Sequence, residues 1–158
     1  MLPAKVANYA IPIPGGKKKI PKFDRWRQLY RDKRMTEKIS NKRIFVVDDD
    51  LPSFQLIEEI FYSYKVTLEY FASGEEFLQT ISRDNLPDLV IMDIQLPGAD
   101  GLELTKEVKK IDPSVPVIAY TSYAMAGDKE RCIKAGCSAY VSKPIDLDKF
   151  LDTVSGYI

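Results

Sequence analysis

From residue 43 onward, the sequence alternates between short apolar segments and amphipathic segments, and this alternation limits the fold more than any other feature. Five apolar segments are predicted to be strands: residues 43–47, 66–71, 89–92, 115–120 and 139–141. Five segments with apolar residues at helical spacing are predicted to be helices: residues 52–62, 73–81, 102–111, 124–135 and 146–154. Strands that are separated by helices must run parallel, with right-handed crossovers. The sequence therefore predicts a five-stranded parallel sheet covered by five helices.

Local capping signals agree with these boundaries. Ser73, followed three residues later by Glu76, forms a capping box at the start of the second helix. Gly136 is placed to end the fourth helix. The fold class that we expect is α/β, a three-layer sandwich with strand order 2-1-3-4-5, as in flavodoxin-like proteins.

The composition excludes several kinds of chemistry. The chain has no histidine, which removes Ser-His and Cys-His catalysis and the usual zinc ligand sets. Its two cysteines, Cys132 and Cys137, are expected to be reduced packing residues of a cytoplasmic protein. No apolar run approaches the roughly 20 residues that cross a membrane, and no signal peptide is present. A carboxylate, a lysine or a metal must therefore carry any chemistry.

The zero net charge conceals a division of the chain into a basic leader, residues 1–42, and an acidic remainder, residues 43–158. The leader begins with a proline-rich stretch in which residues 5–14 alternate like a strand that has no partner sheet. Phe23, Trp26, Leu29 and Tyr30 then recur at the spacing of a short basic amphipathic helix. We interpret it as a linker helix. Weak binding to an anionic membrane surface is an alternative, and nucleic acid would need a DNA-binding domain that the sequence lacks.

Polar residues follow four of the predicted strands. Asp48, Asp49 and Asp50 follow the first, Asp93 the third, Thr121 the fourth, and Lys143 the fifth. The carboxyl ends of parallel strands lie at one edge of the sheet, and strands one and three are neighbours in the predicted order. We therefore expect Asp48, Asp49 and Asp93 to converge.

Converging carboxylates repel one another unless a cation neutralises them. Ligand oxygens without histidine or cysteine favour a hard cation, which in the cell is Mg²⁺. A nucleophilic carboxylate, Mg²⁺, the Lys143 ammonium and the Thr121 hydroxyl together are typical of a phosphoryl-transfer site.

Four motifs, VVDDD, VIMDIQLPGADG, IAYTS and AYVSKP, make residues 42–158 resemble a response-regulator receiver domain of the CheY-like superfamily. The resemblance implies that Asp93 is the phosphoacceptor. It implies that Asp48, Asp49, Asp93 and the main-chain carbonyl of Gln95 bind Mg²⁺, with Asp49 as the more direct ligand of the acidic pair. It also implies that Thr121 and Tyr140 are switch residues and that Lys143 pairs with the phosphoryl group. The peptide bond between Lys143 and Pro144 is expected to be cis.

The resemblance also implies a function, a phosphorylation-dependent switch in a two-component phosphorelay. A histidine kinase or a histidine phosphotransfer protein would be the donor, without turnover of a separate substrate. A downstream protein or a second copy would bind the face formed by residues 124–135, 139–141 and 146–154.

Two alternatives remain. In one, the chain is the receiver module of a hybrid sensor histidine kinase, membrane-associated only through that parent. In the other, it is a haloacid-dehalogenase-like phosphatase. In that family a DxD motif follows the strand. This chain has Gln95 in place of the second aspartate of such a motif and so lacks the general acid.

Overall fold

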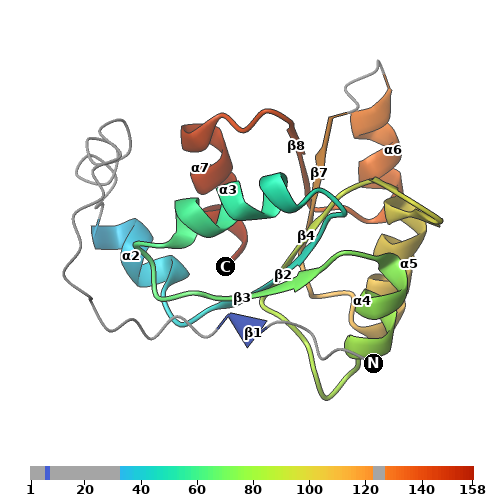
Figure 1. Cartoon of the computed structure of the whole chain (residues 1–158), viewed down its shortest axis with the longest axis horizontal. Coiled ribbons are helices and arrows are strands. Elements are labelled where there is room, and N and C mark those ends of the chain that lie inside the picture. The colour runs from blue at the N-terminus through green and yellow to red at the C-terminus, as the bar shows by residue number, and fades with distance from the viewer. Residues whose placement is uncertain (1–5, 8–32, 123–126) are drawn as a thin grey trace.

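The computed structural model describes residues 6–7, 33–122 and 127–158 (Figure 1). Its strands are β1 (Val6–Ala7), β2 (Arg43–Val47), β3 (Thr67–Phe71), β4 (Leu89–Met92), β5 (Gln95–Leu96), β6 (Ala99–Asp100), β7 (Val117–Thr121) and β8 (Ala139–Ser142). Its helices are α2 (Lys33–Ile39), α3 (Leu51–Phe61), α4 (Gly74–Thr80), α5 (Gly101–Ile111), α6 (Asp128–Ala135) and α7 (Leu147–Tyr157). Among the described residues, no helix is both long enough and apolar enough to cross a membrane.

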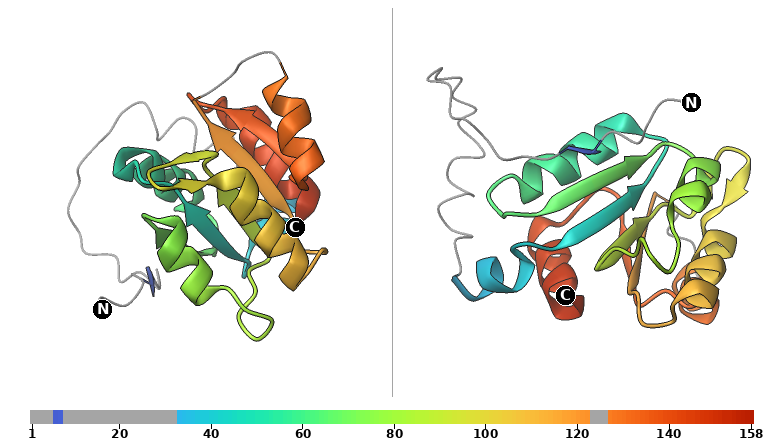
Figure 2. Two further views of the ribbon diagram at one scale, coloured as in Figure 1. Left: turned by 90° about the vertical axis from the view of Figure 1, so that its right-hand side faces the viewer. Right: turned by 90° about the horizontal axis from the view of Figure 1, so that it is seen from below.

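The central sheet confirms the predicted topology. Strands β3, β2, β4, β7 and β8 lie side by side in that order, and each neighbouring pair is parallel. Counting only these five in chain order, the arrangement is 2-1-3-4-5. Helices α3 and α7 cover one face of the sheet, and α4, α5 and α6 cover the other (Figure 2). The fold is the expected three-layer α/β sandwich.

Alternation along the strands divides the core between these two faces. In β2, Ile44 and Val46 pack beneath α3 and α7, whereas Phe45 and Val47 pack toward α4 and α5. All four residues of β4 are buried, because this central strand is covered on both sides. The unbroken apolar run at 89–92 is therefore explained by its position in the middle of the sheet.

Short polar side chains set where the helices begin. Asp50, Ser73, Asp100 and Asp146 each accept a hydrogen bond from a backbone N–H in the first turn of the helix that follows. Gly136 ends α6 with a φ of 106°, a conformation that costs glycine little. Helix α6 begins at Asp128, after Gly127 with a φ of 94°, so Gly127 does not belong to the helix predicted over residues 124–135. Residues 123–126 lie outside the described residues.

The leader strand has a partner, so the expectation that it would be unpaired is wrong for Val6 and Ala7. These residues form β1, which pairs antiparallel with Leu68 and Glu69 on β3 (Figure 1). Strand β3 would otherwise be the edge of the sheet, where unpaired N–H and C=O groups attract another strand. The amphipathic helix expected around Phe23 to Tyr30 lies outside the described residues.

Helix α2 precedes the predicted domain boundary but contributes to the core. It contacts α7, and its Ile39 is fully buried in the cluster that contains Phe150 and Val154. Lys38, one position earlier, is exposed. The division of the chain at residue 43 stays a prediction, but packing does not stop there.

A hairpin that the sequence did not predict follows β4. Strands β5 and β6 are joined by Pro97 and Gly98, and Gly98 has a φ of 73°, as the third residue of a type II turn requires. Gly101, just after the hairpin, donates its N–H to the Ile94 carbonyl at 2.9 Å. A Cβ atom on Gly101 would lie 2.1 Å from the main-chain oxygen of Asp93. The hairpin can therefore close against Asp93 only because residue 101 has no side chain.

Replacing Ile39 with alanine tests whether α2 is part of the folded unit. We expect Ile39→Ala to lower the free energy of unfolding by about 2–5 kcal/mol, because it removes a fully buried side chain. Urea denaturation followed by circular dichroism measures this loss. Lys38→Ala is the control and should have little effect, since Lys38 is exposed. Equal stabilities for the two variants would contradict the packing of α2.

Replacing Gly101 with alanine tests the contact behind Asp93. We expect Gly101→Ala to destabilise the fold by roughly 1–3 kcal/mol or more, because the new methyl group overlaps backbone atoms that cannot move aside cheaply. Gly156→Ala in α7 is a matched control, since a Cβ there meets nothing within 4 Å and alanine favours the helix. Thermal unfolding of the two variants gives the comparison, and an unchanged Gly101→Ala protein would refute the argument.

Candidate functional site

Backbone hydrogen bonds hold the strand-end residues in place. The N–H of Asp48 donates to the Phe71 carbonyl at 3.1 Å, and the N–H of Asp93 donates to the Val47 carbonyl at 2.8 Å. The N–H of Lys143 donates to the Thr121 carbonyl at 2.9 Å. Each polar residue thus continues the pairing of its strand by one step, and the parallel direction of the strands brings these ends to one edge. The bond between Lys143 and Pro144 is cis, as expected.

Three carboxylates lie together at this edge. One oxygen each from Asp48, Asp49 and Asp93 falls within 4.8 Å of the other two. Asp48 is fully buried, Asp93 is 6% exposed and Asp49 is exposed. The site is therefore buried on the side of Asp48 and Asp93 and open to solvent at its mouth, on the side of Asp49. An all-oxygen set of this kind fits Mg²⁺, which keeps several water ligands and takes few from protein.

The Lys143 ammonium bridges the two buried carboxylates. Its Nζ donates to Asp48 Oδ2 at 2.7 Å and to Asp93 Oδ2 at 2.9 Å. Lys143 comes from the end of β8, whereas the two aspartates come from the ends of β2 and β4. Three strands therefore supply one charge cluster, and the lysine compensates two acidic groups that burial would otherwise destabilise.

The local environment shifts the pKa values of two of these groups. Burial raises the pKa of Asp48, and the negative charge of Asp93 adds to this effect, while the Lys143 hydrogen bond opposes it. Burial alone would lower the pKa of Lys143, but its hydrogen bonds to Asp48 and Asp93 outweigh burial and raise it. Lys143 therefore stays charged at neutral pH.

Backbone amides orient the buried carboxylates. Asp48 Oδ1 accepts a hydrogen bond from the Asp50 N–H at 2.9 Å, and Asp93 Oδ1 accepts one from the Gln95 N–H at 3.0 Å. Each carboxylate therefore has one oxygen on the lysine and the other on its own loop. Both oxygens are fixed in direction before any ligand arrives.

Asp50 has a different role from its two acidic neighbours. Its Oδ2 accepts hydrogen bonds from the N–H and the hydroxyl of Ser53, which cap α3. The Ser53 hydroxyl is the main reason that the pKa of Asp50 is lowered. The sequence shows three adjacent aspartates that look equivalent, and only the structure separates the helix cap from the cluster.

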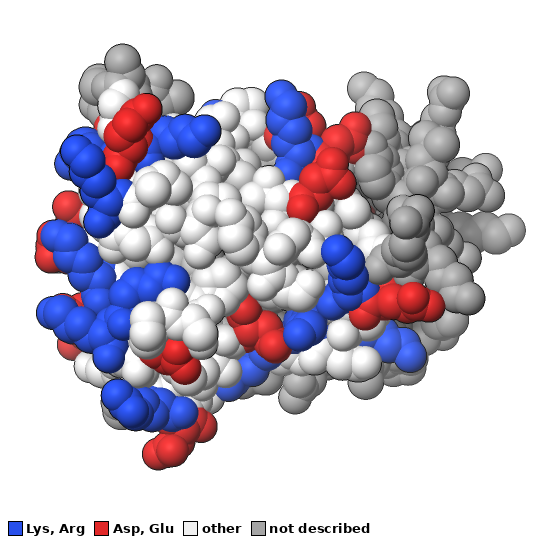
Figure 3. Space-filling model, turned by 180° about the vertical axis from the view of Figure 1, so that it is seen from behind, with Lys and Arg blue, Asp and Glu red and all other residues white. Residues whose placement is uncertain are grey.

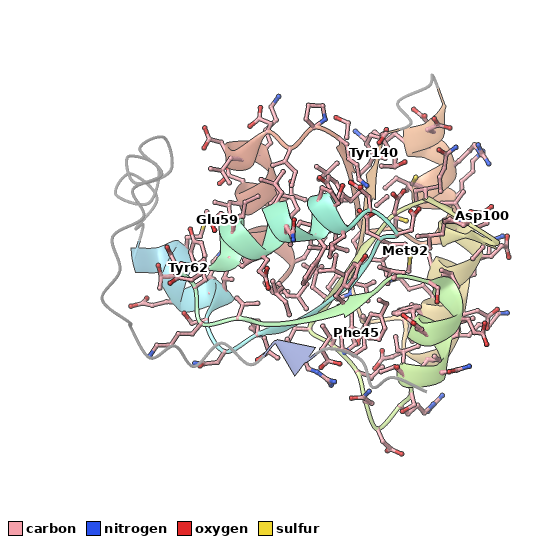
Figure 4. All side chains as sticks on the ribbon, viewed as in Figure 1. Phe45, Glu59, Tyr62, Met92, Asp100 and Tyr140 are labelled. Atoms are coloured by element: carbon pink, nitrogen blue, oxygen red, sulfur yellow. The ribbon has the colours of Figure 1, made fainter. Side chains whose placement is uncertain are left out.

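The two expected switch residues lie on the neighbouring strands β7 and β8. Thr121 is buried at the end of β7, where it lines a cavity of about 420 Å³ between the β5–β6 hairpin and α6. Tyr140 is half-buried on β8 and packs against the cluster that contains Cys132 (Figure 4). The main chain of Gln95 is in the site through its N–H, while its side chain is exposed.

The structure adds one residue that the sequence reasoning missed. The ring centroid of Tyr120 lies 4.8 Å from Lys143 Nζ. Tyr120 precedes Thr121 on β7, and its position next to a strand-end hydroxyl was the only signal in the sequence. The two cysteines are free and buried, and burial raises the pKa of Cys132 to about 11, which makes it unreactive.

Comparison with known proteins identifies the family. The model of the response regulator receiver domain family matches residues 44–155. The polar-differentiation response regulators DivK of Brucella anthropi and Brucella ovis are each 39% identical to this chain over 119 residues. That alignment covers 74% of this chain and 96% of each relative.

Solved structures agree with this family. A CheY-like receiver domain protein from Methanospirillum hungatei is 31% identical, with a TM-score of 0.64, and the match covers 74% of this chain and 93% of that one. The receiver domain of a sensor histidine kinase from Pseudomonas aeruginosa, which has a magnesium ion in its active-site cleft, is 27% identical. Its TM-score is 0.66, and the match covers 75% of this chain and 98% of that one. This chain therefore belongs to the response regulator receiver domain family.

Proposed function

We propose that this protein is a phosphorylation-dependent switch in which Asp93 accepts a phosphoryl group from a histidine kinase or a histidine phosphotransfer protein. The observation that supports this most directly is the cluster of Asp48, Asp49 and Asp93 with the Lys143 ammonium. A carboxylate nucleophile is useful only where cationic groups can hold the incoming phosphoryl charge. This site has one such group in place and acidic ligands for another.

The chemistry requires little more than correct placement. A carboxylate oxygen of Asp93 attacks the donor phosphorus, so an O–P bond forms while the N–P bond of the donor phosphohistidine breaks. The electron pair of that bond returns to the imidazole nitrogen. Asp93 is held by the Gln95 N–H and by Lys143, so it faces the donor in a fixed direction. No second substrate is turned over, since the product stays on the protein until water removes it.

Mg²⁺ fits the carboxylates at the mouth of the site. Asp48, Asp49 and Asp93 would hold the ion, with the Gln95 carbonyl as a further oxygen ligand, and Asp49 is the exposed member that an ion meets first. When bound, the ion supplies positive charge that balances these carboxylates and the phosphoryl oxygens. The receiver from Pseudomonas aeruginosa has magnesium in its cleft, which is consistent with this proposal.

Lys143 and Thr121 would respond to the phosphoryl group. Lys143 is already hydrogen-bonded to Asp93, so it needs only a small movement to donate to an added phosphoryl oxygen. Thr121 lies at the end of β7, the strand next to β4, and would donate its hydroxyl to the same phosphoryl group. Tyr140, on the far side of Thr121, would then move inward. The bistable element is thus the region of α6, β8 and α7.

That region carries charges suited to recognition by a protein. Helix α6 exposes Lys129, Lys134 and Arg131, and Arg131 pairs with Asp128 at 3.4 Å. Figure 3 shows basic and acidic side chains next to each other along the α5 and α6 side of the molecule. Such mixed charge favours a protein partner or a second copy over nucleic acid, which selects a uniformly basic surface.

The alternative origin, a receiver module of a hybrid sensor kinase, keeps the same chemistry. The likeness to a receiver from a sensor histidine kinase is consistent with it. The leader strand gives no support to this origin, because β1 pairs with β3 of this chain. In both cases we propose a cytoplasmic location, where kinase domains and their phosphodonors are found.

Intact mass measured after incubation with acetyl phosphate and Mg²⁺ tests the phosphoacceptor. We expect one phosphoryl group on the wild type and none on Asp93→Asn, because the amide cannot act as the nucleophile. Omitting Mg²⁺ should abolish the addition. A phosphorylated Asp93→Asn protein would show that another residue is the acceptor.

A Mg²⁺ titration followed by thermal unfolding tests the metal ligands. A ligand that binds only the folded state stabilises it by about 2.7 kcal/mol at 100 times its Kd. We expect this stabilisation in the wild type and its loss in Asp49→Asn. Asp50→Asn is the matched control, since asparagine also caps helices and Asp50 is bonded to Ser53. Equal Mg²⁺ responses in all three proteins would argue against Asp49 as a ligand.

A further inference from the structure

The Lys143 side chain must cross a strand to reach its partners. It leaves the end of β8, while Asp93 and Asp48 lie at the ends of β4 and β2, and β7 stands between them. The residue that it passes is Tyr120, the next-to-last residue of β7, whose ring centroid is 4.8 Å from Nζ. This distance is within the range in which a cation is attracted to an aromatic face.

The ring beneath the ammonium is buried and packed against another ring. Tyr120 is 2% exposed, and its ring contacts Phe150 of α7, with centroids 6.4 Å apart. The Lys143 side chain is only 13% exposed, so water compensates its charge poorly. Two hydrogen bonds to carboxylates satisfy two of its three N–H donors. The aromatic face is the further group that faces the ammonium in the described site.

We propose that Tyr120 is a positioning residue for the phosphoryl-transfer site, in which its ring holds the Lys143 ammonium over the carboxylates by a cation–π contact. This role rests on the proposed function of Asp93. A cation over the face of a ring is attracted whichever way its N–H groups point, whereas a hydrogen bond depends strongly on the direction of its N–H group. Lys143 can therefore exchange a carboxylate oxygen for a phosphoryl oxygen without leaving the ring.

An aromatic ring suits this position better than a carboxylate or an aliphatic side chain. The face of the ring has only partial negative charge, so it attracts the ammonium without strongly repelling the phosphoryl oxygens. A buried carboxylate in the same place would hold Lys143 more tightly but would repel the phosphoryl oxygens. A leucine would leave the charged group against an apolar wall, which costs free energy. An aromatic residue avoids both problems.

The test compares Tyr120→Phe with Tyr120→Leu in phosphorylation by acetyl phosphate with Mg²⁺. We expect Tyr120→Phe to react at nearly the wild-type rate, because the ring is kept, and Tyr120→Leu to react roughly three- to tenfold more slowly. In a Lys143→Met background, Tyr120→Leu should cause no further loss. Phe61→Leu changes a buried aromatic residue of the same core whose ring contacts Phe150, and it is the control for general loss of packing.

A second readout does not depend on phosphorylation. In the NMR spectrum, the ring current of Tyr120 should move the ε-methylene protons of Lys143 upfield. This shift should persist in Tyr120→Phe and disappear in Tyr120→Leu. Its absence from the wild type overturns the contact. An unchanged rate in Tyr120→Leu, or an equal loss in the Lys143→Met background, overturns the positioning role. If the wild type takes up no phosphoryl group while the shift is present, the proposed function fails and the contact stands.

Discussion

The site depends on one ammonium group that compensates two buried carboxylates. Asp48 and Asp93 are held almost out of water, where an unpaired negative charge is costly, and Lys143 donates a hydrogen bond to each. The cluster depends in turn on the parallel sheet. Because β2, β4 and β8 run in the same direction, their end residues lie at one edge and can share these charges. A phosphoryl group would therefore enter a site whose negative charges are already partly compensated by Lys143.

Features around the cluster support its geometry without belonging to it. Gly101 lets the β5–β6 hairpin close against the main chain of Asp93, and the Gln95 amide then fixes one oxygen of that carboxylate. Asp50 holds the start of α3 while its own amide fixes Asp48. Thus a residue that cannot have a side chain and a helix cap both keep the site in place. Both residues fix the backbone near the site, and the backbone in turn sets the positions of the carboxylates.

The parts of the chain before residue 43 extend the fold at two places away from the site. Strand β1 covers the open edge of the sheet beside β3, and α2 contacts α7 and buries Ile39. Both contacts follow from ordinary needs, since an edge strand has unpaired backbone groups and an apolar surface attracts an apolar residue. Helix α7 belongs to the region that we propose to respond to phosphorylation, so the leader touches the switch through α2.

The sequence by itself determined the strands and helices of the parallel sheet and the residues at its strand ends, because periodicity and capping are local properties of the chain. The strand order was an expectation from the flavodoxin-like class, and the pairing of the strands confirmed it. The sequence also placed Asp48, Asp49, Asp93, Thr121 and Lys143 at one edge. It could not separate Asp50 from its neighbours, since three adjacent aspartates differ only in what they contact. The partner of β1, the burial of Ile39 and the ring of Tyr120 beneath Lys143 join residues that are distant in the chain. Only tertiary structure decided these, because such contacts arise from how the layers pack and leave no periodic signal in the sequence.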